Sequence, residues 1–424
     1  MSVLYIIVTL SHSTISKSFS SPLFTTYNSG LLNLKLILMS CSVVIFSIVI
    51  LTNIYKTLPS YIYIFLFGII NSIIICLSAN HFLPLILGLE LYTFSVCFLM
   101  LINSDKNNSR IWVVRFLLAS YAATAVLLYG ISLYYSGSGS LSFLKIKFDT
   151  SFSAVVGGAL VISALLFKVG VAPFHAWMID IYEKASFSLI MFFDTIWKFF
   201  VFFIFIRFFK FLLIGYHSQI QTFLELVSVL SMIIGAIMPI SQNKIKKFVA
   251  YSSVGHAGFV ISVFAIANEI SELRFAILYV FTYSLASLCF FTALFNIKKY
   301  CEIVTFNDLS GLMNNSPILG GCITGSMFAM IGIPPFVNFF AKLQILEAQI
   351  YTRHYAVLIV SIIYSLMSVV YTAKAISKIF QPRVTEYKTI KHNITIYFAF
   401  FTIISFSIFY YAVEEWFTEI ITGI

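Results

Sequence analysis

The stretch from residue 164 to residue 198 most constrains what this chain can fold into. Lys168 and Lys198 each lie inside an apolar run, and a cation near the centre of a bilayer costs about 2.5 to 3.5 kcal/mol on insertion scales. Gly170 and Pro173 follow the first lysine and should interrupt its helix, which frees backbone carbonyls. Irregular backbone is tolerated at membrane depth only where it faces protein or a wet cavity. The stretch therefore predicts a polar site inside a helical bundle.

Composition places the chain in the membrane. It is 60% apolar and 10% charged over 424 residues, with a mean hydropathy of +0.98, which exceeds what a soluble domain with a polar surface carries. Apolar runs long enough to cross a core of about 30 Å predict an all-α polytopic membrane protein with about twelve transmembrane helices. These runs are 31–53, 60–80, 82–103, 110–135, 153–174, 185–214, 219–240, 244–268, 272–296, 316–350, 355–380 and 393–413.

The tenth run is too long for one straight helix and carries Gly332, Pro334 and Pro335 at its middle, so we interpret it as a second broken helix. Two interrupted spans five apart predict two five-helix repeats, and an odd number of spans inverts the second repeat. The expected organisation is an N-terminal extension (1–30), a peripheral first helix (31–59), a first repeat (60–214), an inverted second repeat (219–380), and a C-terminal loop with a last helix (381–424).

Basic residues predict the orientation. Loops after odd-numbered spans hold twelve Lys and Arg against six in the even loops, which places the odd loops on the matrix or cytoplasmic side. Both termini then face the other side, the intermembrane space of a mitochondrion. The Ser- and Thr-rich residues 11–30 faintly resemble a transit peptide, but without arginine a surface-lying extension is favoured. Abundant Phe (46) and Tyr (24) suggest AT-rich codons and an organellar genome.

Several classes of function are disfavoured. The six cysteines are scattered singly and no histidine cluster has ligand spacing, so we expect neither a zinc nor an iron–sulfur site. The sequence contains no Walker-type or Gly-x-Gly-x-x-Gly loop, so we expect no nucleotide to bind. The net charge of +10 is explained by the loops of a membrane protein, so nucleic acid is not expected as a partner.

Two charges in the first half of the chain stand out. Glu90 is the ninth of 22 residues in its apolar run, where desolvation requires a carboxylate to be paired or protonated. The alternative is a neutral Glu bonded to a backbone carbonyl. Lys168 is explained by a polar cavity beside the Gly–Pro break, and the alternative is a side chain that extends towards one interface.

Two further lysines lie in later spans. Lys198 is central in its run, with Asp194 one turn earlier on the same face, so a self-neutralising pair that only makes the helix insertable is an alternative to a functional lysine. Lys342 follows Pro335 by seven residues. The alternative there is a lysine that reaches an interface, with Glu347 as partner.

His256 lies nine residues beyond Lys247, about 13 to 14 Å into a helix at 1.5 Å per residue. An imidazole at that depth can titrate or bridge a water chain, and a histidine satisfied by a neighbouring helix is the alternative. Small residues surround it and are expected to allow close helix packing: Ser252, Ser253, Gly255 and Gly258.

Four motifs in order resemble the subunit 2 family of complex I, the proton-pumping NADH:ubiquinone oxidoreductase. They are Phe-Lys-Val-Gly-Val-Ala-Pro-Phe-His-Ala-Trp (167–177) with Asp180 and Tyr182, Gln242 through Ala-Tyr-Ser-Ser-Val-Gly-His (250–256), Asp308-Leu-Ser-Gly-Leu (308–312), and Gly-Ile-Pro-Pro-Phe-Val-Asn-Phe-Phe-Ala-Lys (332–342). The likeness covers about residues 82 to 380. Cation/proton antiporter subunits are close relatives of the same family.

The resemblance implies a role for each candidate. Glu90 matches the family's buried glutamate, Lys168 its partner lysine, Lys198 the central lysine, His256 the intervening histidine, and Lys342 the exit lysine. The chain itself is expected to hold no cofactor, whereas NADH, FMN, iron–sulfur clusters and ubiquinone belong to partner subunits. Other membrane-arm subunits, the lipid bilayer and protons are the implied partners, and the mitochondrial inner membrane is the implied location.

The sequence departs from the family at several positions. Ile179, Lys184 and Ser186 replace a usual Pro, Gly and Pro, which predicts a different loop after the first broken helix. Asn338 replaces a usual Gly, and asparagine tolerates left-handed geometry. Family members have fourteen spans, so two N-terminal helices are expected to be missing, which affects contacts to neighbouring subunits more than the proton path.

The hypothesis is a subunit that moves protons while the redox chemistry happens elsewhere. A charged Glu90 would hold Lys168 protonated, and its withdrawal would change the lysine's proton affinity by about 4 to 7 kcal/mol, against about 2.3 kcal/mol for one charge across 100 mV. The proton would pass Lys198 and His256 to Lys342. The rivals are a non-pumping scaffold, favoured by dry, directly paired lysines, and an autonomous Na⁺/H⁺ exchanger.

Overall fold

The computed structural model describes residues 61–102, 107–142, 152–213, 217–267, 272–298, 303–382, 400–401, 403–404 and 407. Within these residues every regular element is a helix, which confirms the all-α class. The first half contains α3 (Tyr61–Ser78), α4 (Phe82–Ile102), α5 (Asn107–Ser138), α6 (Phe152–Val169), α7 (Ala176–Lys184), α8 (Phe187–Phe192), η1 (Phe193–Trp197) and α9 (Lys198–Leu213). The second half contains α10 (His217–Ser241), α11 (Ile245–Ile266), α12 (Leu273–Lys298), η3 (Phe306–Leu309), α13 (Leu312–Asn315), α14 (Pro317–Ile331), α15 (Val337–Tyr351) and α16 (Tyr355–Phe380).

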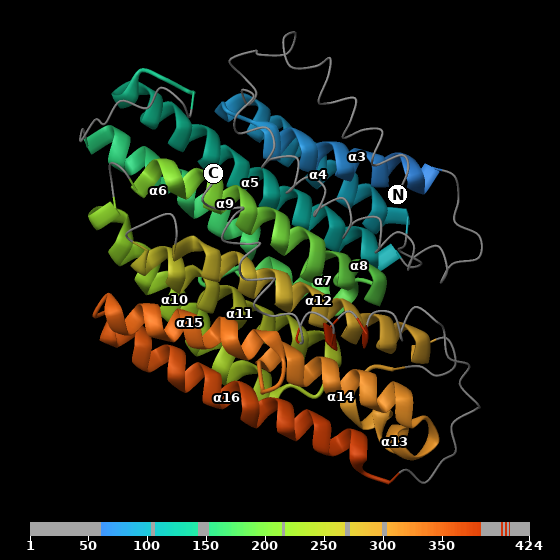
Figure 1. Ribbon diagram of the computed structural model, residues 1–424. Coiled ribbons are helices and arrows are strands. Elements are labelled where there is room, and N and C mark those ends of the chain that lie inside the picture. Colours follow the sequence, from blue (N-terminus) through green and yellow to red (C-terminus); the bar gives the residue numbers. More distant parts are fainter. Residues whose placement is uncertain are drawn as a thin grey trace, which may run out of the picture.

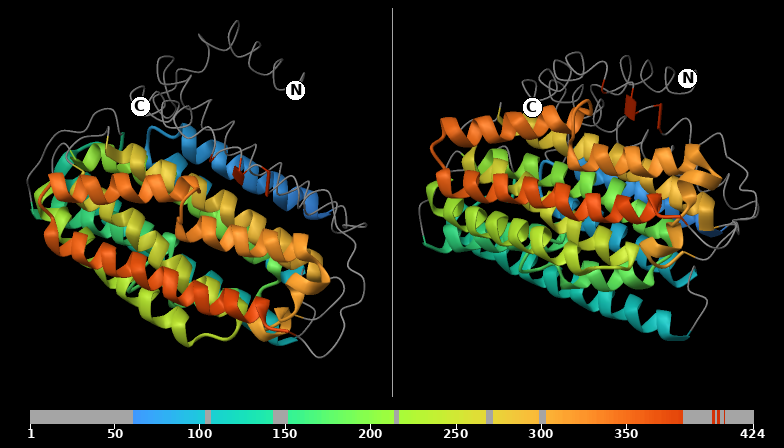
Figure 2. Two further views of the ribbon diagram at one scale, coloured as in Figure 1. Left: turned by 60° about the horizontal axis from the view of Figure 1, so that its bottom comes forward. Right: turned by 90° about the horizontal axis from the view of Figure 1, so that it is seen from below.

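The long helices lie side by side in one bundle, and their order along the chain follows their position across it. Helices α3 to α6 occupy one side and α13 to α16 the other, with α9 to α12 between them (Figures 1 and 2). All of the apolar stretch 187–206 is buried, whereas only 33% of the corresponding windows of α5 and α16 is buried. The interior is therefore formed by residues 187–206 of α8, η1 and α9 and by most of α11 and α12.

Eight helices in the described part of the chain are long and apolar enough to cross a membrane, and α14 and the segment 64–78 are shorter apolar helices. They correspond to the predicted second to eleventh spans. The predicted extension 1–30, the helix 31–59 and nearly all of 393–413 lie outside the described residues, so the total of twelve stays a prediction. The inverted relation of the two repeats also stays a prediction.

The break between α6 and α7 lies where Gly170 and Pro173 predict it. Gly170 has φ +81°, a left-handed conformation that costs glycine little. Two backbone oxygens at the end of α6 accept from side chains: Trp177 Nε1 donates to the Phe167 oxygen (2.9 Å), which also accepts from the Gly170 backbone N (3.1 Å), and Trp197 Nε1 donates to the Lys168 oxygen (2.8 Å). The two indoles thus add donors to carbonyl oxygens in an apolar interior, where an unpaired carbonyl is costly.

The break between α14 and α15 repeats this pattern. Gly332 has φ +76°, and Asn338 Nδ2 donates across the break to the Met330 oxygen (3.0 Å). Asn338 lies in the first turn of α15 with helical backbone, so the left-handed geometry considered for it is wrong. Its amide is used instead, because Thr282 Oγ1 of α12 donates to Asn338 Oδ1 (2.7 Å).

Helices α10 and α11 approach closely through glycine, as the small residues predict. A Cβ atom placed on Gly235 would come within 2.2 Å of the Gly255 Cα, and one on Gly258 would meet Ser231 Cβ at 2.5 Å. Side chains cannot be accommodated at such separations. This contact fixes the position of α11, which carries His256.

Candidate functional site

Lys168 and Glu90 do not form a direct ion pair in the described structure. Lys168 is 2% exposed and its Nζ donates to Ser120 Oγ (3.4 Å), so the alternative of a side chain reaching an interface is wrong. Thr124, one turn along α5 from Ser120, donates to Glu90 Oε1 (2.5 Å). The two charged groups interact electrostatically. Each contacts a different hydroxyl of α5, and the Thr124 hydroxyl is also bonded to the backbone oxygen of Ser120 (3.0 Å). Glu90 itself is half-buried and turned towards α5.

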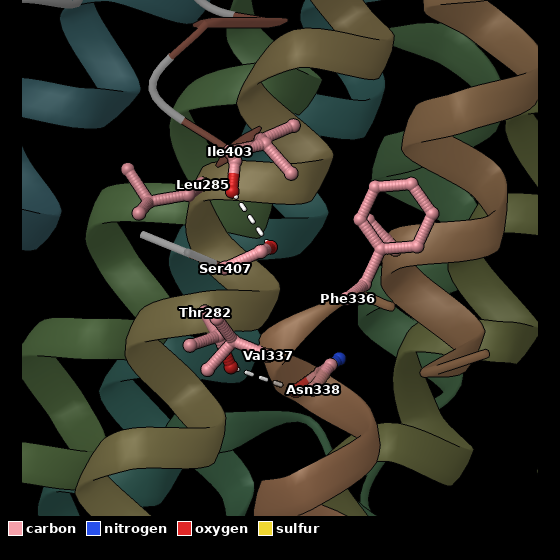
Figure 3. Close-up of a pocket in the computed structure, with 8 residues that line it drawn as sticks. Thr282, Leu285, Phe336, Val337, Asn338, Ile403 and Ser407 are labelled. Carbon is pink, nitrogen blue, oxygen red and sulfur yellow. Dashed lines mark hydrogen bonds between the residues drawn. The ribbon is translucent and has the colours of Figure 1, made fainter. Parts of the chain in front are cut away.

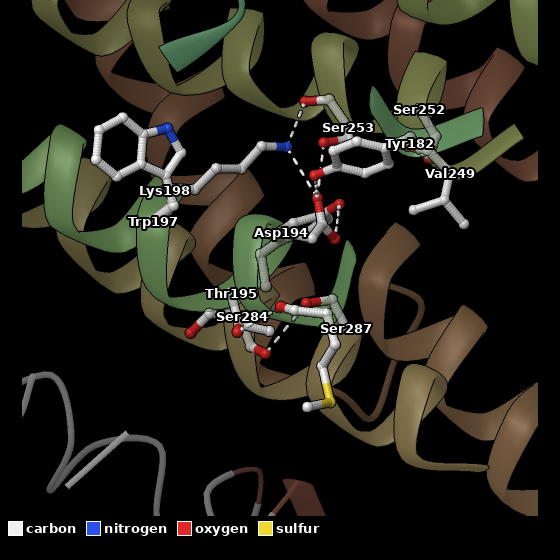
Figure 4. A network of polar contacts seen from close by, with 12 residues as sticks. Tyr182, Asp194, Thr195, Trp197, Lys198, Val249, Ser252, Ser253, Ser284 and Ser287 are labelled. Carbon is white, nitrogen blue, oxygen red and sulfur yellow. Dashed lines mark hydrogen bonds and ion pairs between the residues drawn. The ribbon is translucent and has the colours of Figure 1, made fainter. Parts of the chain in front are cut away.

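Asp194 accepts hydrogen bonds from four other residues and is fully buried (Figure 4). Its Oδ1 accepts from Lys198 Nζ (3.0 Å), Ser253 Oγ (2.7 Å) and Tyr182 OH (3.1 Å). Its Oδ2 accepts from Tyr283 OH (3.1 Å). Such a set of donors stabilises a buried carboxylate, so the Lys198–Asp194 pair is held by α7, α11 and α12 together.

The turn that carries Asp194 is a π-helix, η1, inside an otherwise α-helical segment. Single π turns occur frequently at functional sites because they displace side chains from the ordinary helical face. Lys198 was expected in an unbroken run, and the run is indeed continuous from α8 to α9, with this wider turn directly before the lysine. Lys198 Nζ also donates to the Ser253 oxygen (3.2 Å), which brings it to within one turn of His256 on α11.

His256 lies between the central and the last lysine. Its Nδ1 forms a hydrogen bond with Tyr279 OH (2.7 Å), and its ring is 4.7 Å from that of Tyr283. It interacts electrostatically with both Lys342 and Lys198. The hydrogen bond to Tyr279 of α12 fits a histidine that only joins two helices. The position between Lys198 and Lys342 fits a histidine that belongs to the proton path.

Lys342 is buried in the second broken helix. Its Nζ makes no hydrogen bond to the described protein atoms and lies 5.7 Å from the ring centroids of both Phe259 and Tyr364. The alternative of a lysine reaching an interface is therefore wrong here as well. A buried polar atom without a protein partner indicates either a neutral amine or a bound water.

A small pocket lies at the second break (Figure 3). Thr282, Asn338 and Ser407 supply its polar atoms, and its other lining residues are Leu285, Ala329, Phe336, Val337 and Ile403. The Thr282–Asn338 bond crosses it, so the pocket touches the same polar contact that ties α12 to α15.

The predicted residues thus form two groups inside the bundle: Glu90 with Lys168, and Lys198 with His256 and Lys342. Trp197, the residue before Lys198, joins the two groups through its hydrogen bond to the Lys168 backbone oxygen. The sequence missed the residues that join them. Ser253, read only as a packing residue, donates to Asp194, and Asp194 was read as a partner of Lys198 alone. These bonds could not be predicted from a local sequence pattern, because they join distant segments: Tyr283 lies 89 residues from Asp194. Among the described residues no group of three His, Cys, Asp or Glu could hold a metal ion.

Fold and site together define a multi-pass membrane protein with a set of buried ionisable side chains between two interrupted helices. Residues 79–368 match the family described as NADH:quinone oxidoreductase/Mrp antiporter, TM, and the chain belongs to this family. A Pelagibacter ubique protein called NADH-quinone oxidoreductase subunit N is 32% identical over 331 residues, which cover 77% of this chain and 70% of that protein. A Thiobacillus denitrificans protein of the same name is 31% identical over 72% of this chain and 64% of its own length. The chain thus spans about two thirds of these relatives.

Solved structures share the fold. A chain of the Mrp complex from Dietzia sp. superposes with a TM-score of 0.84 over all of this chain and 91% of its own, at 16% identity. A chain of respiratory complex I from Thermus thermophilus gives 0.78 over 97% of this chain and 91% of its own, at 19% identity. At these sequence identities the similarity shows a shared fold and nothing further.

Proposed function

We propose that this chain is a proton-translocating subunit of the membrane arm of NADH:quinone oxidoreductase, at the position of subunit N, which corresponds to mitochondrial subunit 2. The observation that supports this proposal is the set of ionisable residues from Glu90 to Lys342, which extends through the interior from the first broken helix to the second. The chain would act as part of an enzyme complex, with NADH, FMN, iron–sulfur clusters and ubiquinone held by partner subunits. Its own residues would move protons.

The first step would use Glu90 and Lys168 together with the two hydroxyls of α5 that they contact. Opposite charges about 4 Å apart attract by about 4 kcal/mol at an effective dielectric constant of 20, which exceeds the roughly 2.3 kcal/mol needed to move one charge across 100 mV. A shift of the carboxylate towards or away from Lys168 would therefore be sufficient to load or unload the lysine. Thr124 and Ser120 of α5 lie where such a shift would be transmitted.

The next steps would follow the contacts across the bundle. A proton released by Lys168 would reach Lys198 and Asp194 through water, because no direct hydrogen bond joins the two lysine side chains among the described residues. His256, which interacts with both Lys198 and Lys342, would take it onward. A neutral imidazole bonded to Tyr279 has one ring nitrogen left for this transfer.

Two other functions have specific support. The Dietzia Mrp likeness favours a cation/proton antiporter subunit, for which sodium-dependent proton flux in vesicles is the test. The direct, dry Lys198–Asp194 pair favours a scaffold. Against the scaffold, Lys168 and Lys342 have no direct ion-pair partner among the described residues, and a purely structural interior gains nothing from such groups.

For the location we propose the mitochondrial inner membrane, supported by the Phe and Tyr bias of the composition. The relatives named above are bacterial, and in a bacterium the equivalent complex lies in the plasma membrane. Detection of the chain in the mitochondrial inner-membrane fraction of its source would test this proposal.

Lys168→Met tests the function in the assembled complex. Replacement by an apolar side chain removes a desolvation cost, so assembly should persist. NADH-driven proton translocation into vesicles should be abolished, while NADH oxidation by a soluble electron acceptor continues. Lys184→Met, the same change at an exposed lysine of α7, is the matched control and should pump normally. Wild-type proton flux from assembled Lys168→Met complex would exclude the central role of this lysine.

A further inference from the structure

The set of ionisable residues ends at Lys342, but polar groups continue beyond it on the same helix. Gln349 follows Lys342 by seven residues on α15, which places it on the same face and about 10 Å further along the axis. Ile345 lies between them and is fully buried, and Phe259 and Tyr364 cover the lysine. One apolar layer therefore separates Lys342 from Gln349.

Gln349 is 0% exposed and joins three helices. Its Nε2 donates to Ser262 Oγ of α11 (2.9 Å) and to Ser361 Oγ of α16 (3.1 Å). Its Oε1 is buried and accepts no hydrogen bond from the described protein atoms. A buried amide oxygen without a donor is costly in an apolar interior, and a bound water would supply the missing donor. Packing alone would be better served by an apolar side chain.

The polar groups reach the surface at the corner between α15 and α16. The His354 backbone N donates to the Gln349 oxygen (3.1 Å). The His354 ring contacts Glu225 Oε1 through Nδ1 (2.9 Å) and Gln221 Nε2 through Nε2 (3.0 Å). The side chains of His354 and Glu225 are 23% and 28% exposed, so this pair contacts both the interior and the solvent.

This corner lies at the end of the bundle away from the lysine-rich loops. Glu225 is in the third turn of α10, and the helix runs about 24 Å further to Ser241. Lys244 and Lys247 follow there and pair with Glu183 of α7 (2.8 and 3.1 Å). By the positive-inside rule the lysine-rich end faces the matrix or cytoplasm, so the Glu225–His354 end faces the side to which protons are delivered.

We propose that Gln349 with Ser262 and Ser361 forms the last buried station of the proton outlet, and that the Glu225–His354 pair is the group that releases the proton. This proposal rests on the function proposed above. Ile345 and the two rings separate the station from Lys342. When water enters that layer, the Lys342 ammonium gives up one proton and becomes neutral.

The proton balance then closes without any further reactant. The water held by Gln349 Oε1 accepts the proton and passes one to the Glu225 carboxylate or the His354 imidazole, and that group returns it to bulk water. Gln349 is a positioning residue, because its amide holds the water and carries no proton itself. The rival explanation is structural: the pair would only fasten α10 to the α15–α16 corner.

Four variants in the assembled complex separate the two explanations. Gln349→Met keeps the length of the side chain and removes the acceptor oxygen, and Glu225→Gln removes the carboxylate while keeping its size. Both should lower NADH-driven proton translocation about a hundredfold or more, the low end of what positioned proton-transfer groups contribute. Gln349→Glu and Glu225→Asp keep the oxygens and should restore most of the rate. Translocation is normalised to NADH oxidation by a soluble acceptor, and complex stability is followed by thermal denaturation.

The controls make each failure identifiable. Glu183→Gln breaks an ion pair of similar exposure at the other end of the bundle and should leave translocation unchanged. Lys342→Met should abolish translocation; wild-type flux in that variant would refute the proposed path itself. Lost flux in Lys342→Met with wild-type flux in Gln349→Met and Glu225→Gln would overturn the outlet alone. A loss of thermal stability in Glu225→Gln that matches the loss of flux would favour the structural explanation. If Gln349→Met does not assemble, the surface variant Glu225→Gln decides.

Discussion

Asp194→Asn removes the charge that four neighbouring residues share, and its consequence can be estimated from the structure. The Lys198 ammonium is left buried without its counter-ion, and breaking a buried pair from one side costs about 3 to 5 kcal/mol. Three hydroxyl donors also lose a charged acceptor, at about 1 kcal/mol each. These costs overlap, so we expect about 3 to 5 kcal/mol in total, or a factor of about 10² to 4 × 10³ in the folding equilibrium constant.

Lys198→Met is the informative partner, because it leaves Asp194 with its hydroxyl donors from Tyr182, Ser253 and Tyr283. Removing both charges in the double variant eliminates the uncompensated charge, and such replacements are often neutral in stability. Thermal denaturation of the purified complex should therefore rank Asp194→Asn lowest, with the double variant above it. Proton translocation should be lost in all three variants. A double variant no more stable than Asp194→Asn, or an Asp194→Asn complex as stable as the wild type, would refute the reasoning.

Three further outcomes follow from single contacts. Thr124→Val keeps the shape of the side chain but removes the donor to Glu90. It should destabilise the complex by about 1.5 to 3 kcal/mol and slow proton translocation. The control is Thr372→Val, which loses only a bond to its own helix and should leave the rate of translocation unchanged. Asn338→Ala leaves the backbone oxygen of Met330 without its donor, whereas the Thr282 hydroxyl keeps acceptors in its own helix. Thermal denaturation should therefore show a loss of about 1 to 3 kcal/mol. The hydrogen bond from Lys244 holds the pKa of Glu183 below its ordinary value, against partial burial; the stability that this adds is present at neutral pH and lost as the pH falls through the lowered pKa, so the wild type and Glu183→Gln should converge in thermal stability below about pH 4.

Local rules were sufficient for the features that are encoded in consecutive residues. Gly and Pro positions predicted both interrupted helices, and apolar runs predicted the spans, because backbone geometry and desolvation act over a few residues. Contacts between distant segments could not be predicted in this way. The contacts of Glu90 and Lys168 with hydroxyls of α5 depend on how α5 is rotated about its axis. The environment of Asp194 depends on a π turn, which the spacing of apolar residues does not predict. The sequence indicated which residues would be buried and charged, and only the packing showed which of them touch.

Both interrupted helices are fastened at their breaks, by the indoles of Trp177 and Trp197 at the first and by the amide of Asn338 at the second. A fastened break is a poor hinge, since bending it would expose carbonyl oxygens to an environment without donors. Motion in the interior is then left to side-chain rotation and to the entry of water, because collective helix movements, which take microseconds to milliseconds, would have to bend a fastened break. The turnover rate of the intact complex should accordingly be set by a slower event outside this bundle. Proton transfer within this chain would then not limit the rate and would be controlled by changes at its contacts with neighbouring subunits.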